Sequence, residues 1–325
     1  MSFKAVIPAA GEGQRLRPHT YAFPKVLLEV AGKPIIGHIM DRLLPARPDE
    51  VCVVVGEHGD KIQSYLIEHY DCHFRFVTQD NPKGLGDAVY RAHDFFHGEP
   101  VMVLLGDTIV DLEMSELVGK ENVIGVKEVD DPQRFGIVEL DGEKVQRIAE
   151  KPEKPHSNLA VVGVYYFNES EALFGALSHL IEKDRRTRGE YQLTDALQMM
   201  VDCGVVIRTR RIEHWLDCGT PEALLATNRY LLGKNCYFKS RKGTVFLEPV
   251  YVHDTARIEN SVIGPNVSIG ANARIHSSVI WDSIVNREAL VEHALLEKSL
   301  LGEKSVVKGS VQRLNLSSFS RLEMG

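Results

Sequence analysis

The chain has 325 residues, and its 45 Asp and Glu against 38 Lys and Arg give a formal net charge of -7. This length predicts one large or two moderate hydrophobic cores. The negative charge disfavours a nucleic-acid partner, so any phosphate bound is expected to be small and held locally. No apolar run approaches the roughly 18 residues that span a bilayer, and no signal-peptide pattern begins the chain, so we expect a cytoplasmic protein with no membrane partner. The five cysteines lack a CxxC pair, which indicates reduced, mostly buried thiols.

Short apolar runs alternate with amphipathic stretches from residue 3 to about residue 232. The predicted strands are Phe3–Pro8, Val51–Val55, Phe74–Val77, Val101–Leu105, Ile137–Leu140 and Ala160–Phe167. The predicted helices lie near Ile35–Leu44, Lys61–Tyr70, Asp87–Phe96, Glu171–Glu182, Leu193–Val201 and Pro221–Leu232. Nearly continuous Val, Ile and Leu strands separated by helices are typical of a parallel sheet that is covered on both faces. This region therefore predicts a doubly wound α/β domain.

The pattern changes after the basic, unpatterned stretch GKNCYFKSRKG at residues 233–243, which we interpret as a linker. Two apolar series then recur every six residues, namely Ile263, Ile269 and Ile275, and Val267, Ala273 and Val279. A period near six fits neither an amphipathic helix nor a plain strand, but it is typical of the hexapeptide repeats of a parallel β-helix. The predicted organisation is a catalytic domain at 1–232, a linker at 233–243 and a β-helix at 244–325.

A glycine loop with cations, AAGEGQRLRP, follows the first predicted strand. Glycines at the end of a strand let backbone N–H groups approach an anion. The loop does not match the dinucleotide-binding fingerprint, because Leu16 stands where Gly or Ala is needed. The chain does not match a P-loop either, because Gly32-Lys33 is followed by Pro34 rather than by Ser or Thr. The glycines alone would also fit a plain tight turn. Arg15, Arg17 and Lys25 in the same stretch favour a small phosphate ligand.

Together with motifs downstream, this loop resembles the signature of the sugar-1-phosphate nucleotidylyltransferases, or nucleotide-sugar pyrophosphorylases. The motifs appear in family order, as AAGEGQRLRP with PK and GKP, GLGDAV, LLGD, FGIVELD, EKP, VGVYYF, GEYQLTDAL and WLDCGTPEALLATN. The resemblance covers nearly the whole chain and is closest to glucose-1-phosphate uridylyl- and thymidylyltransferases. It implies a Rossmann-like, doubly wound mixed sheet followed by a short left-handed parallel β-helix. It also implies an enzyme in which a sugar 1-phosphate oxygen attacks the α-phosphorus of a nucleoside triphosphate and expels pyrophosphate.

The resemblance implies charged residues for this chemistry. Arg15 and Lys25 would neutralise the triphosphate and the departing pyrophosphate, because an arginine forks across two phosphate oxygens while a lysine acts as a point charge. Asp107, which ends the apolar run VMVLLGD, and Asp217, in HWLDCGT, would hold Mg²⁺, which takes one or two carboxylates and keeps water and phosphate oxygens as its other ligands. Taken alone, the two cations could be solvated surface groups and Asp107 a turn residue.

The resemblance also implies nucleotide contacts, made by Ala9, Ala10, Gly11, Gly13, Gln79 and Gly84. A glutamine amide offers one acceptor and two donors, so Gln79 could meet the N3–H and a neighbouring carbonyl of a pyrimidine, although guanine also presents an N–H beside a carbonyl. The family tendency favours uridine or thymidine nucleotides. The sequence does not separate UTP from dTTP as the donor. Thymine differs from uracil by one methyl group, which contributes only about 1 to 3 kcal/mol of binding free energy in an apolar pocket. Gly84 could instead be a helix-start glycine, and Asp87 fits an acid in a first helical turn better than a ligand.

Contacts to the sugar 1-phosphate are implied for Gly136, Glu150, Lys151, Gly163 and Thr194. The glutamate would accept hydrogen bonds from sugar hydroxyls, and the lysine would hold the phosphate. The charged pair before Pro152 could also be a solvated turn, and Thr194 with Asp195 could cap a helix rather than line a pocket. The sequence departs from the common family pattern in two places. Ala10 replaces a glycine, as is familiar among uridylyl-transferring members, and Gln14 replaces Thr or Ser, which leaves that phosphate contact open.

The leading functional hypothesis is a Mg²⁺-dependent nucleotidyltransferase that joins UTP or dTTP to a hexose 1-phosphate, most simply glucose 1-phosphate. One alternative is a non-catalytic relative that binds nucleotide sugars and regulates a partner. Such a protein is expected to lose the lysine or the metal acid, and this chain keeps both. Another is a bifunctional enzyme with acetyl transfer in the β-helix, where His253, His276 and His293 are acyl-transfer bases or simply coil-edge residues. The exposed flank of a short β-helix also predicts a homo-oligomer.

Overall fold

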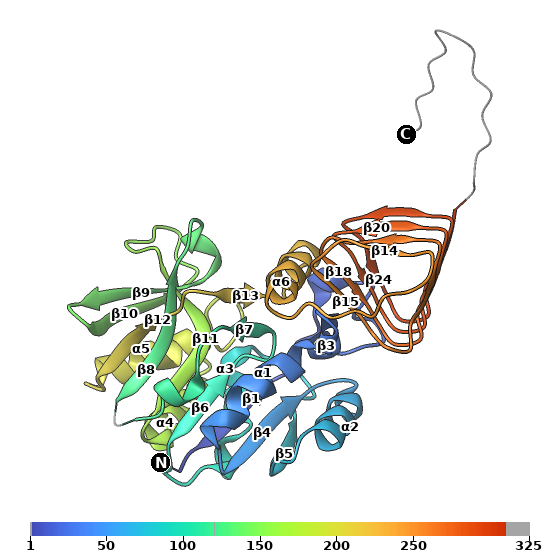
Figure 1. Cartoon of the computed structure of the whole chain (residues 1–325). Helices are drawn as coiled ribbons and strands as arrows, with labels where there is room; N and C mark the ends of the chain where they lie inside the picture. The colour runs from blue at the N-terminus through green and yellow to red at the C-terminus, as the bar shows by residue number, and fades with distance from the viewer. Residues whose placement is uncertain (1, 120, 310–325) are drawn as a thin grey trace. The chain divides into compact units, whose positions relative to one another are not determined.

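The computed structural model describes residues 2–119 and 121–309, which fall into two compact units (Figure 1). The N-terminal unit comprises Met1–Glu29 and Lys33–Thr227, and the C-terminal unit comprises Val30–Gly32 and Asn228–Gly325. The limits predicted for the linker and the β-helix remain predictions, and their last residues, 310–325, lie outside the described part of the chain. In the described ranges no helix combines the length and the apolar character needed to cross a membrane.

The N-terminal unit is built on a nine-stranded mixed sheet with the order β5-β4-β1-β6-β11-β8-β12-β10-β9. Its strands are β1 (Lys4–Pro8), β4 (Glu50–Val55), β5 (Phe74–Thr78), β6 (Val101–Leu104), β8 (Asn122–Glu128), β9 (Gly136–Asp141), β10 (Lys144–Glu150), β11 (Leu159–Phe167) and β12 (Ile207–Arg211). The first four strands in this order are parallel. Strand β11 then runs antiparallel to β6 and to β8. The predicted doubly wound mixed sheet is confirmed.

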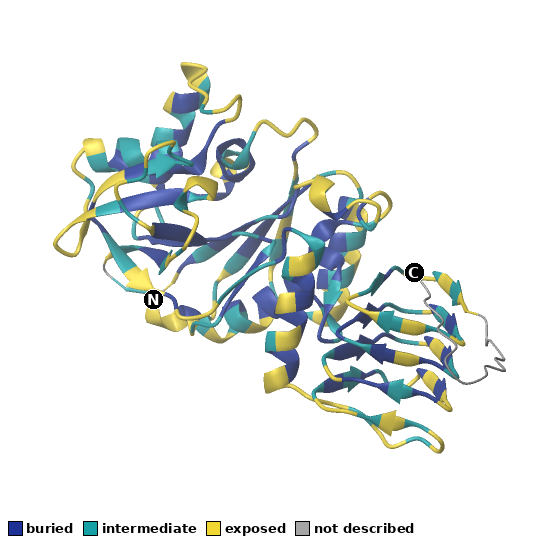
Figure 2. Ribbon diagram, turned by 90° about the horizontal axis from the view of Figure 1, so that it is seen from above, coloured by how far each residue is buried: buried dark blue, intermediate teal, exposed yellow. Residues whose placement is uncertain are grey.

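Helices cover both faces of the sheet because, in its central strands, the residues that point to either face are apolar. The α-helices of this unit are α1 (Ile35–Leu43), α2 (Gly59–His69), α3 (Leu85–Tyr90), α4 (Ser170–Glu182) and α5 (Leu193–Asp202), while α6 (Pro221–Lys234) begins in this unit and ends in the C-terminal unit. Cys52 and Val54 of β4 join one cluster with α3, α4 and α5, while Val51 and Val53 are fully buried on the opposite face. In Figure 2 the central strands of the sheet are mostly in the dark blue of buried residues. The central strands β1, β4, β6 and β11 are therefore largely apolar, which places the polar groups of the glycine loop and of Asp107 at the strand ends.

The helix predicted at Asp87–Phe96 is wrong in its second half. Helix α3 ends at Tyr90, and a separate 3₁₀ turn follows at His93–Phe95. Phe95 and Phe96 are buried in the core cluster, and the Phe95 carbonyl accepts a hydrogen bond from Lys4 Nζ at 2.8 Å. Tertiary packing of the two aromatic rings thus determines the backbone here, rather than the helical pattern.

Short elements connect the larger ones near the sheet edge. The short strands are β2 (Glu29–Val30), β3 (Lys33–Pro34), β7 (Thr108–Val110) and β13 (Trp215–Asp217), and the 3₁₀ turns include η1 (Gln14–Leu16) and η2 (Lys25–Leu27). β7 pairs with β13 in an antiparallel two-stranded sheet, separate from the main sheet. This small ladder brings chain segments more than a hundred residues apart into contact.

The C-terminal unit is a left-handed parallel β-helix, made of three four-stranded parallel sheets. One sheet holds β14 (Val245–Phe246), β17 (Val262–Ile263), β20 (Val279–Trp281) and β23 (Leu295–Glu297). The second holds β15 (Val250–Val252), β18 (Val267–Ile269), β21 (Ile284–Val285) and β24 (Leu300–Leu301). The third holds β16 (Arg257–Glu259), β19 (Arg274–His276), β22 (Leu290–Glu292) and β25 (Val306–Lys308).

The six-residue period reflects the three sides of each coil. Ile263, Ile269 and Ile275 lie on three different sheets and are all buried. The second predicted series breaks at Val279, which is 37% exposed. Its strand neighbour Ile280 faces the interior instead. Residues at the corners take positive φ, for example Asn260, which lets the chain turn from one side to the next.

The described cysteines are all free thiols, as predicted. Cys52 and Cys218 are buried, but Cys203 and Cys236 are exposed and Cys72 is intermediate. The expectation that most of them are buried is therefore wrong, because the exposed thiols lie outside the two cores.

Candidate active site

The glycine loop after β1 forms one wall of a cavity of about 540 Å³ in the N-terminal unit. All four loop residues that were predicted to contact the nucleotide line it, and these are Ala9, Ala10, Gly11 and Gly13. A Cβ on Gly13 would lie 2.9 Å from Thr20 Cγ2, and the residue has φ +63, so a side chain is excluded there on two grounds. By contrast, a Cβ on Gly11 would meet nothing within 4 Å. The absence of side chains leaves the backbone of this loop open to a ligand.

Lys25 and Asp107 form an ion pair at the edge of this cavity. Lys25 Nζ donates to Asp107 Oδ2 at 2.5 Å, and the lysine side chain is only 8% exposed. Burial opposes ionisation of Asp107, but the charge and hydrogen bond of Lys25 hold its pKa below the usual range, helped by Thr108. Both residues line the cavity. Asp107 is therefore a charged, partnered group rather than a plain turn residue.

The β7–β13 ladder places Asp217 beside this pair. Asp217 is paired with Thr108 across the ladder, and the Cys218 N–H donates to the Asp107 carbonyl at 3.2 Å. Burial and the negative charge of Asp107 raise the pKa of Asp217, while the charges of Lys25 and Arg15 lower it. The negative charges of the two carboxylates therefore repel each other, as expected for two side chains that could share one cation.

Arg15 lies on the outer side of Asp217. A Cβ built on Gly219 would be 2.7 Å from Arg15 Nη2 and 2.9 Å from Asp217 Oδ1, so Gly219 leaves room for both groups. The Arg15 side chain is exposed, unlike that of Lys25. The structure therefore brings together the residues predicted as catalytic and metal-binding, with one cation buried and the other facing solvent.

Gln79 also lines this cavity, and it is 4% exposed. Its Nε2 donates to Asp87 Oδ2 at 2.6 Å and lies 3.4 Å from the Gly84 carbonyl oxygen. Gly84 has φ +113, and a Cβ there would lie 2.6 Å from the Tyr191 carbonyl oxygen. Gly84 is therefore required by backbone packing against the 190–191 segment, a reason that the sequence does not reveal.

Asp87 is a residue whose contacts were not predicted. It lies in the first turn of α3, as expected, but it is 4% exposed and holds the Gln79 amide from behind. Arg91 Nε lies 3.3 Å from its second oxygen, Oδ1. The only signal in the sequence is a carboxylate one helical turn before an arginine, which is also common on solvated helix faces.

Of the five residues predicted for the sugar 1-phosphate, Gly136, Lys151 and Thr194 lie around Glu150. Gly136 lies opposite Glu150 in the β9–β10 ladder, and Thr194 Oγ1 donates to Glu150 Oε2 at 3.0 Å. Lys151 Nζ lies 3.3 Å from Glu150 Oε1. A Cβ on Gly136 would come within 2.7 Å of Thr194 Cγ2, so glycine allows the close approach of α5 to the hairpin.

Gly163 lies apart from this group, against the nucleotide cavity. It has φ +83, its carbonyl accepts from the Leu105 N–H at 2.9 Å, and a Cβ would lie 2.7 Å from Leu105 Cδ1. Leu105 itself lines the 540 Å³ cavity. Gly163 thus contacts the cavity only indirectly. It fixes the position of Leu105, which lines the cavity.

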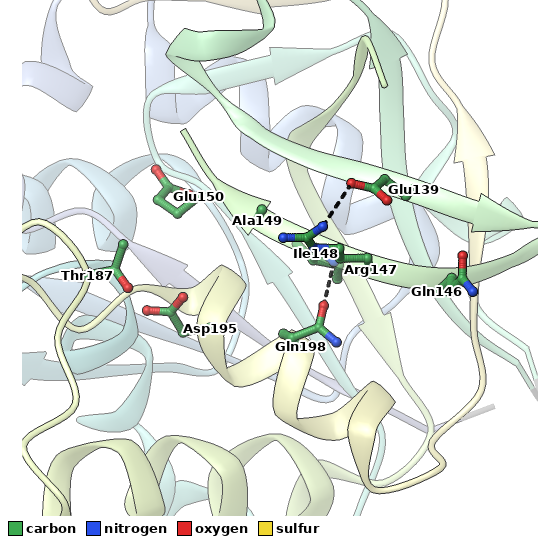
Figure 3. A pocket seen from close by; sticks show the side chains of 9 residues that line it. All are labelled: Glu139, Gln146, Arg147, Ile148, Ala149, Glu150, Thr187, Asp195 and Gln198. Carbon is green, nitrogen blue, oxygen red and sulfur yellow. Dashed lines mark hydrogen bonds and ion pairs between the residues drawn. The ribbon is translucent and has the colours of Figure 1, made fainter. Parts of the chain in front are cut away.

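The alternative that Thr194 or Asp195 caps a helix does not hold. The N-cap of α5 is Gln192, and it makes no side-chain capping hydrogen bond. Thr194 is bonded to Glu150 instead, and Asp195 lines a second cavity of about 680 Å³ together with Glu150 (Figure 3). Burial and the charge of Glu150 also raise the pKa of Tyr165, a contact that the motifs did not predict.

A family model described as nucleotidyl transferase matches residues 4–234, which include every residue of the candidate site. The chain belongs to the nucleotidyl transferase family. The predicted enzyme class, a nucleotidyltransferase, is thereby confirmed. A second family model, described as the GMPPB C-terminal domain, matches residues 246–319.

Named relatives of this nucleotidyltransferase match along most of their length. The low-salt glycan biosynthesis nucleotidyltransferase Agl11 of Haloferax volcanii is 32% identical, over 91% of this chain and 92% of the relative. A glucose-1-phosphate thymidylyltransferase of Streptomyces antibioticus is 30% identical, over 97% of this chain and 96% of the relative. Among solved structures, a UDP-glucose pyrophosphorylase in complex with UDP-glucose is 25% identical and matches 72% of this chain and 100% of its own, with a TM-score of 0.63.

Proposed function

We propose that this nucleotidyltransferase transfers a nucleoside monophosphate from UTP or dTTP to a hexose 1-phosphate, most simply glucose 1-phosphate, with release of pyrophosphate. The observation that carries the proposal is the Lys25–Asp107 pair beside Asp217 at the edge of a glycine-walled cavity. This arrangement combines cations for phosphate oxygens with carboxylates for a metal ion. Relatives named for thymidylyl transfer and for UDP-glucose support the choice of donor and sugar.

The two carboxylates suit a divalent cation, and nucleotidyltransferases of this family generally use one. Burial and the negative charge of Asp107 raise the pKa of Asp217, so a cation between the two carboxylates would stabilise both charged forms. No group of three or more His, Cys, Asp or Glu side chains within the described ranges is arranged to hold a metal ion. Two carboxylates completed by water and phosphate oxygens are the usual environment of Mg²⁺, which would neutralise charge on the phosphates when bound.

The protein groups then supply positioning and charge. In the proposed reaction the phosphate nucleophile is already ionised, so no strong base is needed and rate acceleration comes from alignment and electrostatics. Lys25 presents a nearly desolvated ammonium, which is worth more against phosphate charge than a solvated one. Arg15, more exposed, would contact the outer phosphates bidentately.

The sugar 1-phosphate would bind on the Glu150 side. Thr194 occupies one oxygen of Glu150 and Lys151 lies near the other, so the carboxylate is held in a fixed orientation. A carboxylate oriented in this way accepts hydrogen bonds from vicinal sugar hydroxyls, while Lys151 provides a charge for the phosphate. Asp195 and the adjacent 680 Å³ cavity add further acceptors on the same side.

We further propose a homo-oligomer that forms through the β-helix. On the sheet of β14, β17, β20 and β23 the first residues stack in register as Val245, Val262, Val279 and Leu295. Leu295 is 70% exposed and Val245 is 54% exposed. The sheet of β16, β19, β22 and β25 is more mixed, because its outward positions carry Arg, Glu, His and Lys side chains beside Leu290 and Val306. A stacked aliphatic row is typical of a surface that a second copy covers.

The function is tested by measuring pyrophosphate release for each common nucleoside triphosphate against the 1-phosphates of glucose, galactose, mannose, glucosamine and N-acetylglucosamine. The proposal expects the highest kcat/KM for UTP or dTTP with glucose 1-phosphate. A different sugar or base in first place would correct the substrate assignment. Absence of turnover in every combination would contradict the proposed reaction.

A further inference from the structure

A hydrogen bond to Asp87 holds the side-chain amide of Gln79 in one orientation. Gln79 lines the 540 Å³ cavity, whereas Asp87 is almost completely buried and does not line it. Gln79 Nε2 is 2.6 Å from Asp87 Oδ2, and both side chains are almost completely buried. An aspartate carboxylate has only acceptor atoms, so the NH₂ end of the glutamine must face it. The carbonyl end is then directed away from Asp87.

The carbonyl oxygen of Gln79 is the atom left for a ligand. The amide nitrogen is shared between Asp87 Oδ2 and, more weakly, the Gly84 carbonyl oxygen at 3.4 Å. Among the described residues no donor is bonded to Gln79 Oε1. The second oxygen of Asp87 is paired with Arg91, so the carboxylate is fixed at both ends. The amide is therefore presented as a hydrogen-bond acceptor.

We propose that Asp87 is a positioning residue that determines base specificity by fixing Gln79 with its carbonyl oxygen toward the nucleobase. This inference rests on the proposed function, in which Gln79 contacts the base. Uracil and thymine carry an N3–H that donates to such an acceptor. Cytosine has a lone pair at N3, so two acceptors would face each other and the buried carbonyl would stay unpaired. Guanine, with an N1–H, meets the same requirement, and adenine does not.

The test compares UTP, dTTP and CTP as donors with glucose 1-phosphate, by kcat/KM from pyrophosphate release. In Asp87→Asn the new amide both donates and accepts, so Gln79 is free to turn. We expect the UTP-to-CTP ratio of kcat/KM to fall by about tenfold or more. Asp87→Glu keeps an acceptor-only group and is expected to retain more of the ratio than Asp87→Asn. Asp41→Asn is the matched control, because Asp41 is also a helix carboxylate, paired with Lys33, and lies outside the cavity lining.

Gln79→Ala separates this inference from the function on which it rests. A fall of the UTP-to-CTP ratio in both Gln79→Ala and Asp87→Asn supports the inference. A fall in Gln79→Ala with an unchanged ratio in Asp87→Asn overturns the role of Asp87 and leaves the base contact intact. An unchanged ratio in Gln79→Ala overturns both. If Asp87→Asn lowers kcat/KM for UTP and CTP by the same factor, Asp87 is merely structural and the inference is wrong.

Discussion

Lys25 shows how a single buried charge defines the site. Its side chain is 8% exposed, and its ammonium is matched by Asp107 at 2.5 Å. A buried cation is retained only with a partner, because desolvation of an isolated charge is costly. The pair also keeps Asp107 ionised, since it holds the pKa of that carboxyl down. In the proposed function Lys25 would therefore act both on the phosphate ligand and on the carboxylate that would hold the metal.

Removal of the Lys25 charge is predicted to abolish most of the activity. Lys25→Met keeps the apolar stem, so we expect a folded protein whose kcat falls by about a hundredfold or more, because an electrostatic contact in a desolvated site is lost. Pyrophosphate release measures the rate, and circular dichroism checks the fold. Lys33→Met is the control, since Lys33 is half-exposed and pairs with Asp41. A variant at Lys25 that keeps a near-normal kcat would rule out this role.

Gly84 is predicted to tolerate no side chain. It has φ +113 and a Cβ would meet the Tyr191 carbonyl oxygen at 2.6 Å, whereas Gly142 has φ +61 with no atom within 4 Å. We expect Gly84→Ala to lower the free energy of unfolding by about 2 to 4 kcal/mol and Gly142→Ala by only about 1 kcal/mol. Urea unfolding of both variants makes the comparison. Equal losses would show that the Tyr191 contact is not the cause.

At the level of elements, the candidate active site depends on two contacts between segments that are distant in the sequence, here called joints. The β7–β13 ladder brings Asp217 to Asp107, and the contact of α5 with β10 brings Thr194 to Glu150. Each joint is small and places one functional side chain beside another. Neither joint belongs to the parallel half of the sheet, which supplies the rigid frame for the glycine loop and for Asp107.

The α5–β10 joint predicts a selective effect on the sugar substrate. Thr194→Ala removes the donor to Glu150 Oε2, so the carboxylate loses its fixed orientation. We expect KM for the sugar 1-phosphate to rise about five- to tenfold, the equivalent of one hydrogen bond, while KM for the nucleotide stays within about twofold. Thr194→Ser keeps the hydroxyl and should behave almost like the natural protein. A rise in both KM values would argue for a general structural role.

Most of the strands that the sequence predicted are buried on both faces, although the predicted β5 is only partly buried. β1, β4, β6 and β11 are continuous Val, Ile and Leu runs, so their pattern is plain. β12 has the sequence IRTRR, and its arginines form ion pairs with glutamates on neighbouring segments. Such a strand has no apolar run to detect, because its polar residues are matched by tertiary contacts that a local pattern does not contain.

The candidate site was predicted through ordered motifs, but its internal contacts were not. Each motif placed a residue type at a position, and Lys25, Asp107 and Asp217 do lie together. The Asp87–Gln79 contact and the packing of Gly84 on Tyr191 involve residues whose type and spacing also suit ordinary helix starts. Side-chain orientation across a turn depends on the whole fold, so it could not be read from the motifs alone.

At the scale of the whole molecule, we predict that the aliphatic row on the β-helix controls assembly. Leu295→Asp introduces a charge in the row of Val245, Val262, Val279 and Leu295, and we expect the mass measured by light scattering at micromolar concentration to fall toward that of one chain. Val306→Asp changes another exposed aliphatic residue, 61% exposed against 70% for Leu295, on the third sheet and should leave the mass unchanged. A natural protein that is already monomeric at this concentration would contradict the proposal.

The most direct test of the central claim is the Mg²⁺ dependence of pyrophosphate release from UTP and glucose 1-phosphate, in the natural protein and in Asp217→Asn. If Asp107 and Asp217 hold the metal together, chelation abolishes turnover in the natural protein and added Mg²⁺ restores it. Asp217→Asn then needs about tenfold more Mg²⁺ or more for half-maximal rate, because one charged ligand is lost. Turnover that persists under chelation, or an identical Mg²⁺ requirement in the two proteins, would contradict this account.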